Sequence, residues 1–259
     1  MVPVGSWGWA DPEFRSGFCR AARWSARGAA EGGSLGGSMA LPTFEIEATE
    51  AEQGSVIWLH GLGASNHDFD PIVPELGAPH LRFVFPSAPV RPVTINQGMR
   101  MPSWYDILSF DDPPLREEEA DVRATAIQIR ELIDREVARG VRPDKIVLAG
   151  FSQGGAVALH VGLRSERRLA GVMVLSGYLL MPDTLEDEKQ PEARLTPFLF
   201  CHGRYDPVVP VRLGQSSFAR VTQAGYAAEW VEYDMQHSLC LDEVRRIKSW
   251  LALRLPREA

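Results

Sequence analysis

Three side chains of this sequence have the chemical types needed for nucleophilic attack on an acyl group: Ser152, Asp206 and His237. A serine hydroxyl is a weak nucleophile until a neutral imidazole takes up its proton during the attack. A carboxylate beside the imidazole holds the correct tautomer and stabilises the imidazolium that forms. The three residues are therefore a candidate catalytic triad, provided that the fold brings them together.

The serine lies in Gly150-x-Ser152-x-Gly154, the spacing of a nucleophile elbow between a strand and a helix. A buried strand is predicted over residues 145–149, and an Ala/Val/Leu-rich helix is predicted after the motif. Glycines are needed because the backbone at the serine is strained and neighbouring side chains would clash. The alternative is a Gly-rich turn with an uninvolved serine, because so short a motif also recurs by chance.

The other two candidates follow predicted strands. Asp206 comes after a buried strand at 197–203, and His237 comes after an alternating strand at 228–233. Because the carboxyl ends of parallel strands lie at one edge of a sheet, where ligands bind, both side chains can converge on Ser152. The order Ser, Asp, His along the chain is that of α/β-hydrolases.

Several residues compete with these candidates. A histidine in a loop is usually a surface residue, and an Asp-Pro pair is usually a turn. His60 and His202 also flank or lie in strands, where we expect structural roles. Asp234 lies in the same loop as His237, too near for the usual carboxylate position, although it could act as a substitute.

An acyl-transfer site also needs two backbone N–H groups that stabilise the oxyanion. One should come from the residue after the nucleophile, Gln153. The other should come from the glycine-rich turn at 60–63, where we expect the amide of Leu62.

The elements that must position these residues alternate between strand and helix, which predicts a mainly parallel sheet with helices on both faces. Further strands are predicted at 55–59, 81–85 and 169–175, and helices at 117–139, 209–224 and 242–254. Residues 87–114 and 181–197 are predicted to be loops. We expect one domain over 39–259, preceded by a flexible extension over the Gly/Ser/Arg-rich residues 1–38.

Composition excludes several classes of function. A formal net charge of −7 argues against general binding to nucleic acids or anionic membranes. No apolar run approaches the roughly 18 residues that span a bilayer. The three cysteines show neither metal-binding spacing nor a disulfide framework, which favours reduced thiols in a cytoplasmic protein.

Several blocks of the sequence resemble one known family, the phospholipase/carboxylesterase family, which includes bacterial carboxylesterases and acyl-protein thioesterases. The resemblance implies an α/β-hydrolase fold with no cap domain and no cofactor or metal. It places Ser152, Asp206 and His237 on the family's triad positions, and Leu62 and Gln153 on its oxyanion positions. It also implies that Trp104 lies by the nucleophile in a shallow groove for the acyl chain. The blocks are Leu59-His-Gly-Leu-Gly63, residues 87–96, Met101-Pro-Ser-Trp-Tyr-Asp106, Gly150-Phe-Ser-Gln-Gly-Gly155, residues 201–210 and residues 235–238.

One departure from the family pattern is Gln236, where many relatives carry a small residue before the histidine. This side chain would narrow the rim of the site, and it leaves the catalytic roles unchanged.

We expect a serine carboxylesterase that hydrolyses short- to medium-chain esters through an acyl-enzyme on Ser152, with a small acyl ester as substrate. Two alternatives stay open: an acyl-protein thioesterase or lysophospholipase with the same triad, and a non-catalytic module that binds ligands. A homodimer is an open expectation for the assembly.

Overall fold

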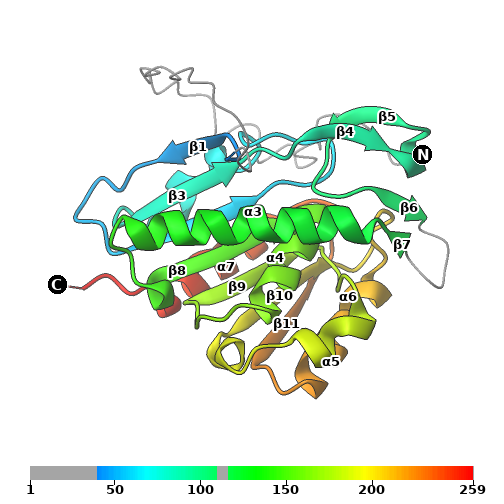
Figure 1. Cartoon of the computed structure of the whole chain (residues 1–259). Helices are drawn as coiled ribbons and strands as arrows, with labels where there is room; N and C mark the ends of the chain where they lie inside the picture. Colours follow the sequence, from blue (N-terminus) through cyan, green and yellow to red (C-terminus); the bar gives the residue numbers. More distant parts are fainter. Residues whose placement is uncertain (1–39, 110–115, 259) are drawn as a thin grey trace.

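The computed structural model describes residues 40–109 and 116–258, and its centre is a seven-stranded sheet (Figure 1). The strand order is β1-β3-β2-β8-β9-β10-β11; β1 is antiparallel to β3, and all other neighbours are parallel. The predicted mostly parallel sheet is confirmed. The strands are β1 Thr43–Ile46, β2 Gly54–Leu59, β3 Leu81–Pro86, β8 Ile146–Phe151, β9 Gly171–Leu175, β10 Phe198–Gly203 and β11 Ala228–Tyr233.

Helices cover both faces, as predicted. Figure 1 shows α3 (Glu119–Ala138) along the front of the sheet and α7 (Leu241–Arg254) behind it. Side chains of α3, α4 (Gln153–Leu163) and α6 (Val211–Gln223) belong to one buried cluster, and those of α2 (Val73–Leu76) and α7 to a second. Gly140 and Gly225 follow α3 and α6 with positive φ values, as expected of residues that end helices.

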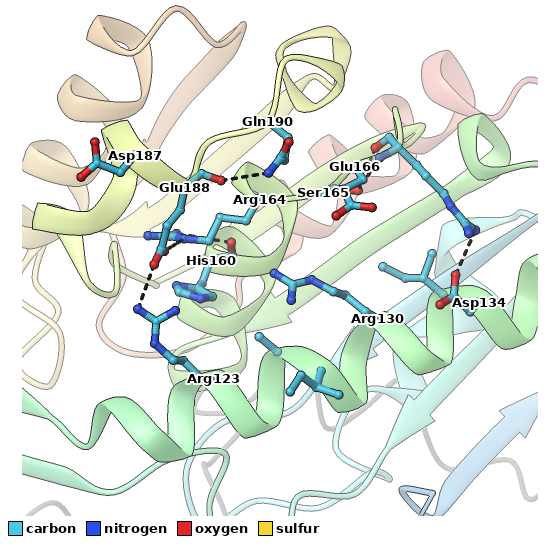
Figure 2. Close-up of a pocket in the computed structure, with 14 residues that line it drawn as sticks. Arg123, Arg130, Asp134, His160, Arg164, Ser165, Glu166, Asp187, Glu188 and Gln190 are labelled. Atoms are coloured by element: carbon cyan, nitrogen blue, oxygen red, sulfur yellow. Dashed lines mark hydrogen bonds and ion pairs between the residues drawn. The ribbon is translucent and has the colours of Figure 1, made fainter. Parts of the chain in front are cut away.

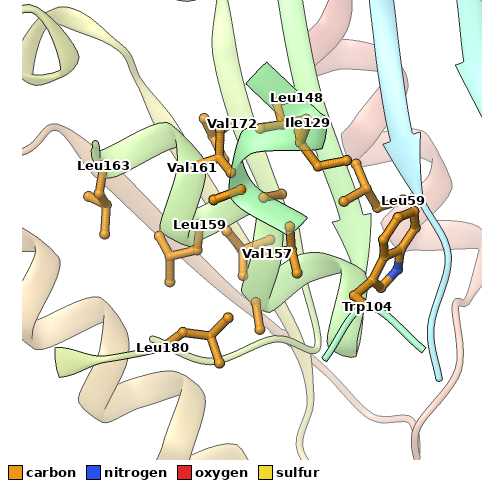
Figure 3. Close-up of a cluster of buried hydrophobic side chains, with 14 of the residues drawn as sticks. Leu59, Trp104, Ile129, Leu148, Val157, Leu159, Val161, Leu163, Val172 and Leu180 are labelled. Atoms are coloured by element: carbon orange, nitrogen blue, oxygen red, sulfur yellow. The ribbon is translucent and has the colours of Figure 1, made fainter. Parts of the chain in front are cut away.

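The two clusters explain why the central strands are apolar at nearly every position. Successive side chains of a strand point to opposite faces of the sheet. In β2, Ile57 and Leu59 belong to the α3/α4 cluster, whereas Val56 and Trp58 belong to the α7 cluster. Figure 3 shows the first cluster, in which Leu59 lies next to Trp104. Burial on both faces produces the short hydrophobic runs from which these strands were predicted.

A buried ionic network ties the edge of the sheet to α3. Arg82 on β3 is 4% exposed and pairs with Glu45 and Glu47 at the antiparallel edge. Its Nε lies 3.4 Å from the carboxylate of Glu136, a fully buried residue of α3. Ser55 Oγ donates to the same carboxylate at 2.7 Å. The network fixes the carboxyl-terminal half of α3 against β2 and β3.

The prediction of a loop over 87–114 is wrong for much of its length. The segment contains the hairpin β4–β5 and the first strand of the hairpin β6–β7, and residues 110–114 lie outside the described residues. Asp106 connects the two hairpins, because its carboxylate accepts hydrogen bonds from Thr94 N at 2.7 Å and Thr94 Oγ1 at 2.6 Å. The bounds are β4 Val90–Val93, η2 Thr94–Asn96, β5 Met99–Pro102, β6 Ile107–Ser109 and β7 Arg116–Glu117.

The predicted loop over 181–197 also contains short helices: η4 Pro182–Thr184, α5 Leu185–Glu188 and η5 Glu192–Leu195. Two more single turns lie elsewhere in the described residues, η1 Asp70–Ile72 and η3 Pro143–Lys145. The proposed extension over residues 1–38 lies outside the described residues.

Candidate active site

Ser152 sits at a strained turn between β8 and α4. Its backbone angles are φ 56° and ψ −120°, a conformation that side chains rarely adopt. The strand ends at Phe151 and the helix begins at Gln153. A Cβ at Gly154 would lie 2.5 Å from two backbone oxygens of the 59–60 segment, and one at Gly150 would overlap Gly154. The two glycines of the motif are therefore required by contact between backbones.

The three residues predicted as a triad form one hydrogen-bonded chain. His237 Nε2 lies 2.9 Å from Ser152 Oγ, and His237 Nδ1 lies 2.6 Å from Asp206 Oδ2. Because a carboxylate only accepts hydrogen bonds, Nδ1 carries the proton and Nε2 is left to accept the serine hydroxyl. The three residues are 7–8% exposed, so the chain of bonds is largely shielded from water.

The carboxylate of Asp206 is fixed from both sides. Its Oδ1 accepts hydrogen bonds from the backbone N–H groups of Val208 and Val209, both at 2.8 Å. These bonds orient Oδ2 toward His237. The Asp-Pro pair lies in a turn, as such pairs usually do, and this turn also holds the carboxylate in place.

The loop that carries His237 packs directly on the end of β10. A Cβ at Gly203 would come within 2.6 Å of Met235 O, so glycine allows the loop to approach. Tyr205 N–H donates to Met235 O at 3.1 Å. The ring of Phe151 lies 4.7 Å from that of His237, measured between centroids, and covers one side of the imidazole.

The competing residues have other partners. The ring of His60 is bonded at both nitrogens, to Gly61 O at 2.7 Å and from Ala88 N–H at 3.0 Å, and burial lowers its pKa. His202 donates to a backbone oxygen at 2.8 Å, and burial lowers its pKa as well. Asp234 pairs with Arg204 at the surface. Structural roles for both histidines agree with the expectation.

The side chain of Gln153 holds the segment that passes beside the elbow. Its Oε1 accepts from Trp104 N at 2.9 Å, and its Nε2 donates to Tyr105 O at 2.7 Å and to Ser103 Oγ at 3.0 Å. Gln153 is only 2% exposed. The sequence predicts a role for the backbone amide alone, and nothing in the motif reveals this second role of the side chain.

The turn at 60–63 lies beside the nucleophile. A Cβ built on Gly61 would be 3.4 Å from Ser152 Cβ. The turn is held by Gly63 N–H, which donates to Pro102 O at 2.8 Å, and by Ala64 N–H, which donates to Gly61 O at 3.2 Å. The turn is near enough to supply an oxyanion donor, and donation by the Leu62 and Gln153 amides stays a prediction.

Trp104 lies beneath the site instead of lining its surface. The side chain is 0% exposed, and its Nε1 donates to His60 O at 2.8 Å. The Trp104 and His60 rings lie 5.1 Å apart. In this structure the indole therefore offers no surface to a ligand. The exposure of Trp104 does not support the direct contact with an acyl chain that was expected of it.

Sequence reasoning also missed a buried pair of tyrosines near this segment. The hydroxyls of Tyr105 and Tyr178 lie 2.6 Å apart, and burial raises the pKa of both. Tyr178 follows β9, so the pair joins the 103–105 segment to the next strand end. A pairing over 73 residues leaves no local signal in a sequence.

Two further observations concern the part of the chain that the structure describes. No cluster of three or more His, Cys, Asp or Glu side chains there has the arrangement of a metal site. Among the same residues, no helix is both long and apolar enough to cross a bilayer.

Comparisons with known sequences agree with this geometry. Residues 41–255 match the family described as Phospholipase/Carboxylesterase. Acyl-protein thioesterase 1 of Neurospora crassa is 37% identical over 229 residues, which are 84% of this chain and 94% of the relative. Acyl-protein thioesterase 1 of Cryptococcus neoformans var. neoformans is 36% identical and covers 82% of this chain and 96% of its own length.

Solved structures give the same result. SOBER1 of Arabidopsis thaliana superposes with a TM-score of 0.74 at 33% identity, covering 78% of this chain and 99% of its own. Acyl-protein thioesterase 2 of Zea mays also has a TM-score of 0.74, at 25% identity over 83% of this chain and 99% of its own. With the predicted sheet, the elbow and matches over nearly the whole described chain, this protein belongs to the phospholipase/carboxylesterase family of α/β-hydrolases and is a hydrolase of the ester or thioester type.

Proposed function

We propose that this protein is an acyl-protein thioesterase, which hydrolyses the thioester between a fatty acyl group and a protein cysteine. The observation that carries the proposal is the hydrogen-bonded chain from Ser152 through His237 to Asp206 at a strained elbow. The same chain would serve for oxygen esters. The preference for thioesters is supported by the relatives named acyl-protein thioesterase 1, at 36–37% identity over most of both chains.

The first half of the reaction transfers the acyl group to Ser152. As the hydroxyl oxygen attacks the thioester carbon, its proton passes to Nε2 of His237 across the 2.9 Å hydrogen bond. Asp206 stabilises the resulting imidazolium through its 2.6 Å contact with Nδ1. The amides of Leu62 and Gln153 stabilise the oxyanion. The carbon–sulfur bond then breaks, and the leaving thiolate takes the proton from Nε2.

The second half releases the acyl group. Water occupies the place of the departed thiol, His237 takes one of its protons, and the hydroxide attacks the serine ester. Collapse of the second tetrahedral intermediate returns the proton to Ser152 Oγ and frees the fatty acid. Every proton moves through one ring nitrogen, which requires a neutral imidazole with its proton on Nδ1.

Labelling with a fluorophosphonate tests the catalytic proposal. The parent protein should be labelled at Ser152, and Ser152→Ala should lose the label completely. Ser249→Ala removes a hydroxyl that donates to Arg245 O on α7, and it serves as the matched control that keeps full labelling. Absence of labelling in the parent, or labelling that survives in Ser152→Ala, would refute the proposal.

A pair of matched substrates tests the leaving group. One peptide carries a palmitoyl group on a cysteine and the other carries it on a serine at the same position. We expect a higher kcat/KM for the thioester, and for nitrophenyl esters we expect rates that rise with chain length from two to sixteen carbons. Faster cleavage of the oxygen ester, with a preference for short chains, would instead support the carboxylesterase function expected from the sequence.

A further inference from the structure

A second pocket lies away from the triad, at the other end of the elbow helix. It has a volume of about 630 Å³ and is bordered by α3, by the end of α4 and by α5 with the residues after it (Figure 2). His160 of α4 lines it, eight residues after Ser152. At 1.5 Å per residue, the two residues are separated by about 12 Å along the helix axis. None of the triad residues lines this pocket.

His160 has an unused acceptor in the pocket. The residue is 2% exposed, and its Nδ1 has no hydrogen-bond partner within the described residues. A backbone hydrogen bond at Leu180 engages the ring. Burial, followed by the charges of Arg164 and Arg130, lowers the pKa of His160 to about 3. The ring is therefore neutral at neutral pH, and Nδ1 presents a lone pair while the bond to Leu180 holds the proton on the other nitrogen.

Arginine side chains surround this acceptor. Figure 2 shows Arg123 and Arg130, both from α3, on either side of the His160 ring. Arg123 and Arg164 share one carboxylate, that of Glu188, at 2.8 and 2.6 Å. Arg130 makes no ion pair with any described residue. Arg123 also pairs with Glu119, at 2.7 Å. The three guanidinium groups therefore face two carboxylates, and the environment of His160 keeps an excess of positive charge.

The other carboxylates that line the pocket do not neutralise the positive charge near the His160 ring. Asp134 is paired with Arg167 at 2.9 Å. Glu166 and Asp187 are exposed residues at the rim. Figure 2 shows Asp187 at the far side of Glu188, with its carboxylate away from the histidine.

We propose that this pocket is a binding site for hydrogenphosphate, free or as a phosphomonoester monoanion, whose oxygens accept from Arg130 and Arg123 and whose P–OH donates to His160 Nδ1. Guanidinium groups match the geometry of phosphate oxygens. A buried acceptor without a partner favours a ligand that carries its own proton. Sulfate has the same shape and charge but has no proton to donate at neutral pH, so the site should discriminate between the two ions.

Isothermal titration calorimetry at pH 7.5 tests the site on the full chain. Inorganic phosphate should give a saturable signal, and sulfate should bind at least fivefold more weakly, because a neutral hydrogen bond is worth about 1 kcal/mol. Arg130→Gln should weaken phosphate binding about tenfold, since its hydrogen bond is charge-assisted. Arg130 is exposed, so this variant should fold. Arg245→Gln, at an exposed arginine of α7, should leave binding unchanged.

His160→Phe tests the acceptor. This variant should lose the preference for phosphate over sulfate. If it fails to fold, the titration of Arg130→Gln and the comparison of phosphate with sulfate on the parent still test the proposed site. Glycerol 3-phosphate tests whether the site accepts a phosphomonoester as well as free phosphate. A phosphomonoester loses its last proton near pH 6, so a monoester should bind better at pH 5.5 than at pH 7.5.

Three results would overturn the proposal: no saturable signal with phosphate at either pH, equal binding of phosphate and sulfate, or phosphate binding that Arg130→Gln leaves unchanged. Fluorophosphonate labelling of Arg130→Gln should equal that of the parent. Labelling reports only on Ser152, so failure of the phosphate site and failure of the proposed hydrolase activity are distinguishable.

Discussion

The buried side chain of Gln153 has a role that substitution can separate from the role of its backbone. Gln153→Met keeps most of the side-chain volume and the backbone amide, but it removes the acceptor for Trp104 N and the donor to Ser103 Oγ and Tyr105 O. Ser103 Oγ and Tyr105 O stay hydrogen-bonded to each other in this variant, since Ser103 Oγ donates to Tyr105 O at 2.6 Å. Trp104 N–H loses its only described acceptor.

The expected cost follows from these partners. A buried donor without an acceptor costs about 1–3 kcal/mol, and the loss of the two remaining bonds adds about 1 kcal/mol. Gln153→Met should therefore lower the free energy of unfolding by about 2–4 kcal/mol. The loosened segment also carries the indole that donates to His60 O, so kcat should fall. The fall should stay below the roughly 100- to 1000-fold that follows loss of an oxyanion donor, because the amide is retained.

Guanidinium denaturation and hydrolysis of a nitrophenyl ester measure the two effects. Gln223→Met, at an exposed position near the end of α6, is the matched control and should change the unfolding free energy by less than about 0.5 kcal/mol. If Gln153→Met is as stable as this control, the side chain does not hold the 103–105 segment and the reasoning is wrong.

Three further predictions concern other groups. Asp206→Asn should lower kcat about 10⁴-fold with little change in melting temperature, because the amide favours the wrong tautomer of His237; a loss under tenfold would contradict this. Arg82→Leu should destabilise the fold by about 3 kcal/mol in denaturant, since it leaves Glu136 buried with fewer partners; a cost under about 1 kcal/mol would count against the network. Burial raises the pKa of Glu243 from 4.5 to about 8, so between these values the folded chain holds a proton that the unfolded chain releases, and stability falls as pH rises. The difference in melting temperature between Glu243→Gln and the parent should therefore shift in favour of the variant from pH 5 to pH 8. An equal difference at both pH values would refute this.

Much of the fold could be predicted because its central strands are short apolar runs followed by turn residues. The strand at 228–233 has the predicted bounds, and the helix predicted from 242 begins one residue earlier, at Leu241. The convergence of Ser152, Asp206 and His237 also followed from one rule, that parallel strands end at one edge of the sheet. These features depend on local pattern and topology, which a single sequence contains.

The features that were missed depend on contacts over long distances in the chain. The β4–β5 hairpin and strand β6 are held by Asp106 and by pairing between short strands, so they have no hydrophobic period. The burial of Trp104 depends on partners 44 and 49 residues away, in His60 and Gln153. The position of Trp104 in the sequence could not show whether its side chain lies beneath the site or on its surface.

The backbone-to-backbone contact at the start of α4 has a consequence for how such an enzyme can change. Gly154 and Gly155 meet the sheet without side chains: a Cβ on Gly155 would lie 2.9 Å from Gly150 O. The nucleophile is therefore positioned by main-chain atoms, whose location does not depend on which side chains surround them. Side chains of the neighbouring hairpins can therefore be exchanged while these main-chain contacts keep the serine where it is. The position of the nucleophile and the composition of the hairpins can evolve separately.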